Sequence, residues 1–377
     1  MKIIHIITGL GDGGAEHTLF KICKYDKLNK HIVISLKGSG KYLPLLNKLG
    51  VKVYCLNVNF FSINKFFFLI NLLRSLKPDL VQTWLVHGDF IGSLAARLAG
   101  IKNIVWNVRY SKIEIGKAKI KTILIIKVLS KLSYFIPKLI IIVSKKAKKI
   151  YQDEGYDKKK LKFIPNGYDL SILKVNKNKK IDFQKKIRIK KQMPLIGCVA
   201  RFDPLKDHLN LLNSISLIRL NNTNFFCVLV GTNINKSKIL INEIKRLKLN
   251  DCIKLLGPTK NISEVMNSID IHVQSSRSEG FPNVVAEAMA HKTPCIVTNV
   301  GDSSYIVGNT GWVVPPNEPV KSAKAIQLAF NEISTKNWVK RCNKARERIG
   351  KKFSIGKMIE SYNNLWINVH KKDDKKI

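Results

Sequence analysis

Short apolar segments alternate with longer segments of helical periodicity along the first half of the chain. The apolar segments are rich in Ile and Val, and they are Lys2–Thr8, His31–Leu36, Val51–Leu56, Asp79–Trp84, Asn103–Val108 and Leu139–Ser144. Strands that alternate with helices form a parallel sheet, and such strands are apolar throughout because helices bury both faces. This half of the chain therefore predicts a doubly wound α/β domain.

The same alternation begins again after a basic segment. Residues 174–193, "KVNKNKKIDFQKKIRIKKQM", contain eight Lys and one Arg, a composition that predicts a solvated linker. Further strands are expected at Leu195–Ala200, Phe225–Gly231, Asp251–Gly257, Ile269–Gln274 and Pro294–Asn299. We therefore expect two Rossmann-like domains that face one another, residues 1–180 and 181–355, with a substrate cleft at the carboxyl ends of their strands. Residues 356–377 are helical and could pack on either domain.

The composition is that of a globular protein, with 377 residues of which 45% are hydrophobic and 24% charged. The longest apolar stretches, Phe66–Leu73 and Leu139–Val143, are too short to span a membrane. The N-terminus leads into a strand-like segment without a signal-peptide pattern, so we expect a cytoplasmic protein. Seven scattered cysteines without a C-x-x-C pair favour reduced thiols over disulfides or a zinc site.

The net charge of +40 arises from 66 basic against 26 acidic residues. Such a charge favours anionic partners, which include nucleic acid, acidic lipid headgroups and phosphorylated substrates. Its other interpretation is a coding bias toward lysine on solvated surfaces. The chain contains no RNP-like, zinc-finger or repeated aromatic-basic pattern, so we expect no nucleic-acid partner.

A glycine-rich loop follows the first strand in "TGLGDGGAEHTLFKI", Thr8–Ile22. Its glycines allow close approach of the backbone to a ligand, and a helix that begins near Gly14 would present free N–H groups to an anion. The spacing differs from G-x-G-x-x-G, and no acidic residue ends the second strand, which disfavours a nicotinamide cofactor. A tight turn without any ligand is the alternative interpretation.

Two cations follow the first strand of the second half, in "CVARFDPLKDH", Cys198–His208. Arg201 and Lys206 are suited to neutralise a diphosphate, Arg as a planar fork and Lys as a point charge. Taken alone, the pair is better explained as solvated surface residues.

Two carboxylates, Glu279 and Glu287, lie in "SEGFPNVVAEAMA", Ser278–Ala290. On one helix they would lie about 12 Å apart, at 1.5 Å per residue. That distance is too long for a glycosidase pair, which needs roughly 5 to 9.5 Å, and for two ligands of one metal. It suits an elongated ligand that is held at both ends, with a negative centre at the helix N-terminus. A nucleotide sugar has this form.

These motifs together resemble those of the retaining glycosyltransferases of family 4, which have the GT-B fold, and the likeness extends over nearly the whole chain. The most specific part is E-x7-E at Glu279 and Glu287, followed by "TPCIVTNVGDSSYIVGNTGWVVPP". Also similar are "GLGDGGAE", "IPNGYD" at Ile164–Asp169, "VARFDPLKDH" and "LVG" at Leu229–Gly231.

The resemblance implies a role for each matching residue. Glu279 would contact the donor hexose and Glu287 the ribose hydroxyls, while Arg201 and Lys206 would bind the diphosphate and stabilise it as a leaving group. Backbone groups of the intervening loop would hold phosphate or sugar oxygens, and the loop after the first strand would close over the diphosphate; these residues are Gly280, Phe281, Pro282, Asn283, Gly13 and Gly14. The last helix of the family returns to the N-terminal domain.

The chain departs from the family pattern at three places. Many members have a His just after the fourth strand, where this chain has Trp84. His87, three residues later, is the candidate for the same role, and a loop histidine with satisfied hydrogen bonds is the alternative interpretation. Arg109 after the fifth strand is a candidate for contact with the acceptor. His291 and Lys292 stand where relatives often have a glycine, and the sequence offers no interpretation of them.

The activity implied by the resemblance is transfer of a hexose or N-acetylhexosamine, with retention, from a nucleotide sugar to a glycan or lipid-linked glycan. The expected donor is a UDP-sugar, and the expected pathway is polysaccharide or lipopolysaccharide synthesis. If cationic side chains assist departure of the diphosphate, no metal or other cofactor is needed. In keeping with this expectation, the chain contains no Asp-x-Asp. A nucleotide-sugar epimerase and a non-catalytic anion- or nucleotide-sugar-binding protein on membrane or nucleic acid are the alternatives.

Two segments, Asn64–Lys77 and Lys117–Lys138, combine apolar residues with Lys at spacings that permit basic amphipathic helices. They could attach the protein to the inner face of the plasma membrane, or they could be ordinary helices that pack on the sheet with their lysines outward.

Overall fold

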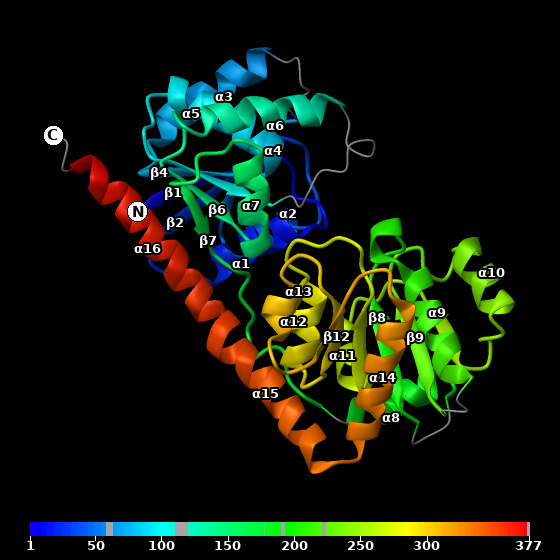
Figure 1. Ribbon diagram of the computed structural model, residues 1–377. Helices are drawn as coiled ribbons and strands as arrows, with labels where there is room; N and C mark the ends of the chain where they lie inside the picture. The colour runs from blue at the N-terminus through cyan, green and yellow to red at the C-terminus, as the bar shows by residue number, and fades with distance from the viewer. Residues whose placement is uncertain (58–62, 110–119, 177, 190–192, 221–223, 375–377) are drawn as a thin grey trace. The chain divides into compact units, whose positions relative to one another are not determined.

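A computed structural model describes residues 1–57, 63–109, 120–176, 178–189, 193–220 and 224–374 (Figure 1). The chain divides into two compact units. The N-terminal unit comprises Met1–Gly167 together with Ile355–Ile377, and the C-terminal unit comprises Tyr168–Ser354. Each unit is built on its own parallel sheet, which confirms the predicted fold class. The domain limits expected from the sequence, 1–180, 181–355 and 356–377, stay a prediction.

The N-terminal unit contains a sheet of seven strands in the order β3-β2-β1-β4-β5-β6-β7. All neighbouring strands pair in parallel, and Ile6 of β1 lies between Ile34 of β2 and Thr83 of β4. The strands are β1 (Lys2–Ile7), β2 (Lys30–Ser35), β3 (Lys52–Cys55), β4 (Leu80–Trp84), β5 (Ile104–Val108), β6 (Leu139–Ile142) and β7 (Leu161–Phe163). Their side chains alternate between the two faces, so Ile4 and Ile6 join one apolar cluster and Ile3 and Ile7 join the other.

Helices cover both faces of this sheet. One face is covered by α3 (Ile63–Leu76), α5 (Ser93–Leu98), α6 (Ile120–Leu132) and α7 (Lys145–Asp153), and the other by α1 (Gly14–Tyr25), α2 (Leu43–Lys48) and α16 (Ile355–Asp374). Two short helical turns, α4 (Leu85–His87) and the π-helix η1 (Gly88–Gly92), connect β4 to α5.

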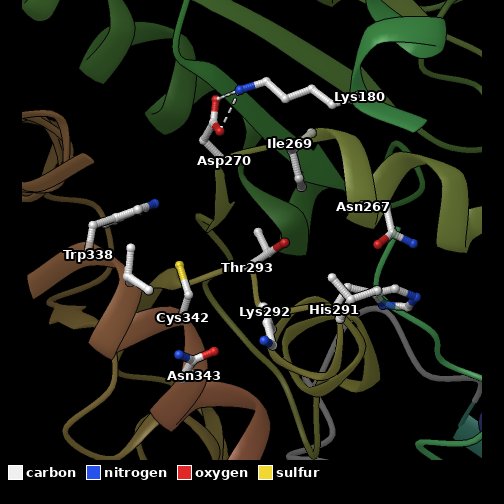
Figure 2. Close-up of a pocket in the computed structure, with 12 residues that line it drawn as sticks. Lys180, Asn267, Ile269, Asp270, His291, Lys292, Thr293, Trp338, Cys342 and Asn343 are labelled. Carbon is white, nitrogen blue, oxygen red and sulfur yellow. Dashed lines mark hydrogen bonds and ion pairs between the residues drawn. The ribbon is translucent and has the colours of Figure 1, made fainter. Parts of the chain in front are cut away.

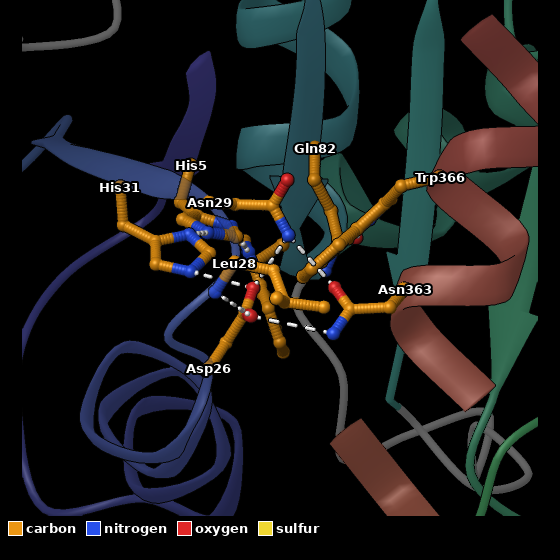
Figure 3. A network of polar contacts seen from close by, with 9 residues as sticks. His5, Asp26, Leu28, Asn29, His31, Gln82, Asn363 and Trp366 are labelled. Atoms are coloured by element: carbon orange, nitrogen blue, oxygen red, sulfur yellow. Dashed lines mark hydrogen bonds and ion pairs between the residues drawn. The ribbon is translucent and has the colours of Figure 1, made fainter. Parts of the chain in front are cut away.

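The C-terminal helix α16 belongs to the N-terminal unit, as the family resemblance implied. It buries a stripe of side chains against the sheet: Met358, Ile359, Tyr362, Leu365, Trp366 and Val369. Polar contacts fix its register, because the Trp366 indole N–H donates to Gln82 Oε1 at 2.7 Å. Asn363 also reaches the carboxylate of Asp26, as Figure 3 shows. This helix therefore completes a domain whose other residues lie at the far end of the chain.

The C-terminal unit contains a sheet of six parallel strands in the order β10-β9-β8-β11-β12-β13. The strands are β8 (Leu195–Val199), β9 (Phe226–Val230), β10 (Ile253–Leu256), β11 (Ile271–Gln274), β12 (Cys295–Thr298) and β13 (Trp312–Val314). The helices are α8 (Asn178–Lys186), η2 (Pro204–Lys206), α9 (His208–Arg219), α10 (Lys238–Arg246), α11 (Ile262–Ser268), α12 (Asn283–Ala290), α13 (Ser303–Val307), α14 (Pro319–Ile333) and α15 (Lys336–Phe353).

The basic segment 174–193 is not a solvated linker, so that prediction was wrong. Most of its described part is helix α8, which belongs to the C-terminal unit and buries Phe183 and Gln184. Lys180 on this helix bonds both oxygens of Asp270 at 2.7 and 2.8 Å. The charge count was misleading because α8 buries Phe183 and Gln184 while its lysines stay at least partly exposed. Residues 177 and 190–192 of the segment lie outside the described residues.

Candidate functional site

The C-terminal unit brings Lys206 and Glu279 into direct contact. Lys206 Nζ donates to Glu279 Oε1 at 2.6 Å, and Ser276 Oγ donates to the same oxygen at 2.7 Å. The side chains are 23% exposed for Lys206 and 11% exposed for Glu279, so the pair is shielded from water but still reachable. Two of the residues selected from the sequence thus form one charged centre.

The two residues meet because β8 and β11 are neighbouring parallel strands, whose following loops emerge at the same edge of the sheet. Backbone and side-chain hydrogen bonds tie these loops together. Ser275 Oγ donates to the Lys206 carbonyl at 2.9 Å, and Arg277 N donates to the Leu205 carbonyl at 2.8 Å. Both interactions hold the turn that carries Lys206 against the loop that carries Glu279.

Asp207 ends this turn and begins the next helix. Its φ of 47° lies in the left-handed region, its carboxylate accepts from the N–H of Asn210 as an N-cap of α9, and Arg277 Nε donates to it at 2.7 Å. A capping Asp stabilises a helix by about 1 kcal/mol. The helix start therefore fixes the position of Lys206 from its C-terminal side.

Arg201 follows the same strand, β8, but stands apart from the Lys206 and Glu279 pair. Its side chain is 68% exposed, and its Nε and Nη2 donate to Asp203 Oδ2 at 3.2 and 3.1 Å. Burial raises the pKa of Asp203, but the Leu205 N–H and the Arg201 guanidinium lower it further, so that the net shift is downward. Arg201 is therefore held by an ionised carboxylate at the rim of the site.

The loop after Glu279 leads into α12. Pro282 is the residue before the helix, and no side chain caps its N-terminus. Asn283 Oδ1 accepts from the Tyr168 hydroxyl at 2.6 Å. Because Glu279 precedes the helix, the separation expected for two glutamates on one helix does not apply. Only Glu287 lies on α12, where it is half-buried.

Gly301 supports the Glu279 loop and was missed by sequence reasoning. Its φ is +49°, and a Cβ at this position would lie 2.3 Å from the Glu279 carbonyl oxygen and 2.5 Å from that of Gly280. The next residue, Asp302, donates its N–H to the Gly280 carbonyl at 2.9 Å. Only glycine fits such an approach. Its place in "VTNVGDSS" was the available signal.

His291 and Lys292 form the C-terminal cap of α12. His291 Nδ1 donates to the Glu287 carbonyl at 2.8 Å, and Lys292 has a φ of 62°, the left-handed conformation that glycine usually provides after a helix. Burial is the main cause that lowers the pKa of His291, so the ring is neutral and bonds by its Nδ1–H. This chain therefore ends α12 with a histidine that bonds the last turn and a lysine in the left-handed conformation, where relatives often have a glycine.

In the N-terminal unit, the glycine-rich loop follows β1, and α1 begins at Gly14 as predicted. Gly13 is the N-cap residue, with extended backbone and no side-chain cap. The Glu16 carboxylate lies beside it, since a Cβ on Gly13 would be 2.4 Å from Glu16 Oε2. An anion that binds at this helix start must therefore displace the Glu16 side chain.

His87 ends α4, directly after β4, and is half-buried. Burial, with a contribution from Lys37, lowers its pKa, which keeps the ring neutral at pH 7. A neutral imidazole can accept or donate a proton near neutral pH. Its position at the carboxyl edge of the first sheet is the one where ligands of such sheets bind.

Arg109 follows β5 and is engaged in hydrogen bonds within its own unit. Its guanidinium donates to Asn107 Oδ1 at 2.9 Å, Asn166 Oδ1 at 2.9 Å and the Tyr362 hydroxyl at 3.2 Å. It also lies over the Trp84 ring, 5.3 Å from the centroid. Arg109 thus joins β5, the "IPNGYD" loop and α16, and its proposed contact with an acceptor stays a prediction.

One group in the described part of the chain has the composition of a metal site: His5, Cys23 and His31, all buried. Its hydrogen bonds argue for another state. The Trp84 indole N–H donates to His5 Nδ1 at 3.2 Å, which leaves the His5 proton on Nε2, and this atom lies 3.0 Å from His31 Nδ1. His31 Nε2 then donates to Asp26 at 3.0 Å (Figure 3). A metal bound to His5 Nε2 would require the ring proton to lie on Nδ1, where it would face the Trp84 N–H. The residues therefore fit a directed chain of hydrogen bonds better than a metal.

A separate pocket of about 370 Å³ lies at the opposite edge of the C-terminal sheet. Figure 2 shows its wall, in which the Lys180 and Asp270 ion pair, Thr293 and Cys342 are labelled. Asp270 directly precedes β11 and Thr293 precedes β12, whereas Lys206 and Glu279 follow strands. This pocket is therefore distinct from the charged centre described above.

Two family models match the chain and together extend over both units. "Glycosyltransferase Family 4" matches residues 12–172, and "Glycosyl transferases group 1" matches residues 179–351. The chain belongs to glycosyltransferase family 4. Lys206 and Glu279 are thus part of a glycosyltransferase, and both lie in the segment that the second model matches.

Curated relatives of this glycosyltransferase align over most of their own length. The UDP-Gal:alpha-D-GlcNAc-diphosphoundecaprenol alpha-1,3-galactosyltransferase of Escherichia coli is 27% identical over 80% of this chain and 78% of the relative. The N,N'-diacetylbacillosaminyl-diphospho-undecaprenol alpha-1,3-N-acetylgalactosaminyltransferase of Campylobacter jejuni is 26% identical over 86% and 89%.

Among solved structures, Anabaena HepE in complex with UDP is similar over 98% of this chain and 100% of that chain, with a TM-score of 0.86 and 19% identity. At that identity the likeness shows the shared GT-B fold. No helix in the described part of this glycosyltransferase is both long and apolar enough to cross a membrane.

Proposed function

We propose that this glycosyltransferase moves a hexose or N-acetylhexosamine from a UDP-sugar to a lipid-linked glycan, with retention of the anomeric configuration, in cell-surface polysaccharide or lipopolysaccharide synthesis. The observation that carries the proposal is the contact of Lys206 with Glu279 at the carboxyl edge of the C-terminal sheet. A cation and a carboxylate in contact can bind the two groups that the broken bond joins, the phosphate and the sugar. The carboxylate accepts from sugar hydroxyls, and the ammonium neutralises the phosphate.

In the proposed complex, the donor diphosphate takes the place of Glu279 as a partner of Lys206. The exposed guanidinium of Arg201 adds a second cation from the rim. As the bond between the anomeric carbon and the phosphate oxygen breaks, its electron pair moves to the nucleoside diphosphate. Cations that are already in place stabilise this charge without reorganisation, which is typically the largest contribution to such catalysis.

The acceptor hydroxyl forms the new bond to the anomeric carbon on the face that the diphosphate leaves. A phosphate oxygen of the leaving group takes the hydroxyl proton, so the step is balanced without a covalent enzyme intermediate. Glu279 orients the sugar, and Glu287 on α12 accepts from the ribose hydroxyls. His87 and Arg109 are proposed to act on the acceptor side, and the backbone at Gly13 and Gly14 on the diphosphate.

The named relatives support the choice of donor and acceptor. One uses UDP-Gal, and both named enzymes act on sugars linked to diphosphoundecaprenol, as their names state. The solved Anabaena HepE structures hold UDP or UDP-glucose. A polyprenyl acceptor also agrees with a chain whose net charge is +40, because its diphosphate is anionic.

We further propose peripheral attachment to anionic membranes through α3 and α6. Both helices pack on the same face of the N-terminal sheet, through Leu69 and Leu129 among others. Their outer sides expose large apolar residues, of which Phe67 is 58%, Phe68 55% and Leu124 62% exposed. Lysines beside them would add about 1 kcal/mol each near an anionic surface. Residues 117–119 of the second basic segment lie outside the described residues.

The donor is tested by release of nucleoside diphosphate from a panel of UDP-, GDP-, ADP- and dTDP-sugars. We expect hydrolysis of one or two UDP-sugars and a large increase when a diphosphopolyprenyl glycan is added. Absence of turnover with every donor, together with equal binding of all nucleoside diphosphates in calorimetry, would favour the alternative of a non-catalytic anion-binding protein. The anomeric coupling constant of the product, compared with that of the donor, tests retention.

Membrane attachment is tested by sedimentation with vesicles of phosphatidylcholine alone or mixed with phosphatidylglycerol at moderate salt. The Phe67→Ser, Phe68→Ser variant should bind the mixed vesicles at least tenfold less than the unchanged chain. The matched control, Leu328→Ser with Val320→Ser, removes two exposed apolar residues from the C-terminal unit. Equal binding to both vesicle types by the unchanged chain would refute the attachment.

A further inference from the structure

The segment that carries His87 has an unusual backbone. After β4 the chain forms α4 and passes directly into η1, a π-helix that comprises Gly88–Gly92. Leu85, the first residue of α4, has a φ of 67°, which is costly for a residue with a side chain. Isolated π-helical turns are frequent at functional sites, and residues in strained conformations cluster there as well. Leu85 lies two residues before His87, and η1 begins directly after it.

The two glycines of η1 allow it to pack directly on β1. A Cβ at Gly88 would lie 3.0 Å from the Ile6 carbonyl oxygen, and a Cβ at Gly92 would lie 2.8 Å from Ile6 Cγ2. The Gly88 N–H also donates to Thr8 Oγ1 at 3.2 Å. Close packing of this kind holds the turn in one conformation, so a change inside the turn must be transmitted to its neighbours.

Asp89 lies inside this turn with its side chain completely buried. Its Oδ1 accepts from Thr83 Oγ1 at 2.6 Å, whereas Oδ2 has no hydrogen-bond partner among the described residues. The Ser93 hydroxyl donates to the backbone carbonyl of Asp89. A buried carboxylate with so few donors is costly, and a buried carboxyl proton without an acceptor is costly as well.

The described groups that face Asp89 carry no charge that would settle its state. Thr83 on β4, the Asn107 N–H on β5 and Ser93 on α5 are uncharged, while β1 and α6 contribute apolar residues such as Ile6 and Ile126. Burial raises the pKa of Asp89 to about 7, against the lowering effect of Thr83 and Asn107. The carboxyl and the carboxylate are therefore both populated near neutral pH.

We propose that Asp89 is a positioning residue, whose gain or loss of a proton changes the hydrogen bonding of the π-helical turn and so the placement of the His87 ring. The ionised form accepts from the Thr83 hydroxyl. The protonated form must instead donate its O–H, which at Oδ1 reverses the direction of the bond with Thr83 and at Oδ2 finds no acceptor among the described residues. The two forms therefore favour different local arrangements. His87 immediately precedes the turn, so a shift of the turn's backbone would shift the His87 ring as well. The inference rests on the proposed function for the role of His87, but not for the coupling itself.

The coupling is tested without turnover by NMR titration of the full-length protein with ¹³C-labelled histidine. The His87 resonance is assigned by its loss in His87→Asn. We expect this resonance to show an inflection near pH 7 in addition to the titration of the ring. In Asp89→Asn the inflection should vanish, and in Thr83→Val it should move upward by about one pH unit, because a hydrogen bond to the ionised form is removed. An unchanged inflection in Asp89→Asn, or its absence in the unchanged chain, would overturn the proposal.

A kinetic experiment separates positioning from a merely structural role. In the unchanged chain, kcat/KM for the acceptor should depend on pH with the same inflection near 7, while KM for the donor should not. Asp89→Asn should abolish that dependence. If Asp89 only supported the fold, this variant would lower Tm and leave the pH profile unchanged. Failure of the proposed function would appear instead as no turnover at any pH, and the NMR titration would still report on Asp89.

Discussion

Lys206 and Glu279 are separated by 73 positions in the chain, and Lys206 Nζ lies 2.6 Å from Glu279 Oε1. The pair is largely shielded from water, because the Lys206 side chain is 23% and the Glu279 side chain 11% exposed. In such surroundings a charge acts more strongly than in water, because less solvent screens it. Removal of either partner should therefore affect function far more than removal of an exposed charge.

The first prediction concerns the two cations. Replacement of Arg201 and Lys206 together by Ala should reduce kcat for sugar transfer at least tenfold, because the leaving diphosphate loses both stabilising charges. Initial rates at saturating donor measure the effect. The control is Lys245→Ala with Arg246→Ala on α10, which removes the same charge from an exposed surface and should leave kcat unchanged. More than a tenth of the original kcat in the first variant would contradict the assigned role.

The second prediction separates the two glutamates. Glu279→Gln keeps the shape of the side chain but loses its charge, and we expect kcat to fall by about 10²-fold since the contact serves the reacting sugar. Glu287→Gln should act mainly on KM for the donor, by about tenfold, because ribose contacts hold ground and transition states alike. Glu347→Gln, on the exposed part of α15, is the control. Equal effects of the two site variants on kcat would refute the division of roles.

The third prediction uses the backbone of Lys292, whose φ is 62°. Lys292→Gly should raise the free energy of unfolding by about 1 kcal/mol, because glycine adopts this conformation without the steric cost of a Cβ. Urea unfolding measures it. Lys324→Gly, in the exposed middle of α14, should instead lower the free energy by about 1 kcal/mol. A loss of stability in Lys292→Gly would show that the lysine side chain contributes more than its backbone costs.

The fourth prediction concerns acid stability. Burial lowers the pKa of His272 to about 4, with a smaller opposing effect from the Gly197 backbone. Between pH 4 and 6.5 the unfolded chain binds this proton and the folded chain does not, so stability is complete above pH 6.5 and falls as the pH drops toward 4. The loss from this residue is about 3 kcal/mol at most.

His272→Met should reduce this dependence on pH, since methionine carries no proton in either state. Unfolding in urea at pH 7 and pH 4.5 measures the difference between the two free energies. Ile271→Met, on the same strand, changes packing without changing titration and should leave the difference as it is. If His272→Met also leaves it unchanged, the acid sensitivity arises from other groups, such as His208, whose pKa burial also lowers to about 4.

Most strands were predictable from the sequence because a short run of Ile- and Val-rich apolar residues marks each of them. The expected segments agree with β1 to β6 and β8 to β12 to within two residues at either end. The strands β7 and β13 were missed, since Leu161–Phe163 and Trp312–Val314 are too short to show a pattern. The lysine count of 174–193 concealed α8, because composition alone does not reveal which side of a helix is buried.

The candidate site was only partly predictable. Its charged residues were selected from their motifs, but the hydrogen bond from Ser276 to Glu279 and the close approach of Gly301 were not. Asp89 had no motif to mark it. Its burial and the π-helical turn around it result from packing against β1, which no local pattern records.

The sequence by itself determined the alternation of strands and helices, the two parallel sheets and the motifs of family 4. These properties are local, because a buried strand or a helix start is encoded in neighbouring residues. The tertiary structure decided which side chains meet. Lys206 touches Glu279 because β8 and β11 are adjacent in the sheet order, and Asp89 is buried because a turn without Cβ atoms at its ends lies on β1. Contacts of this kind depend on strand order and close packing across the fold, and the distance between two residues in the chain does not determine either.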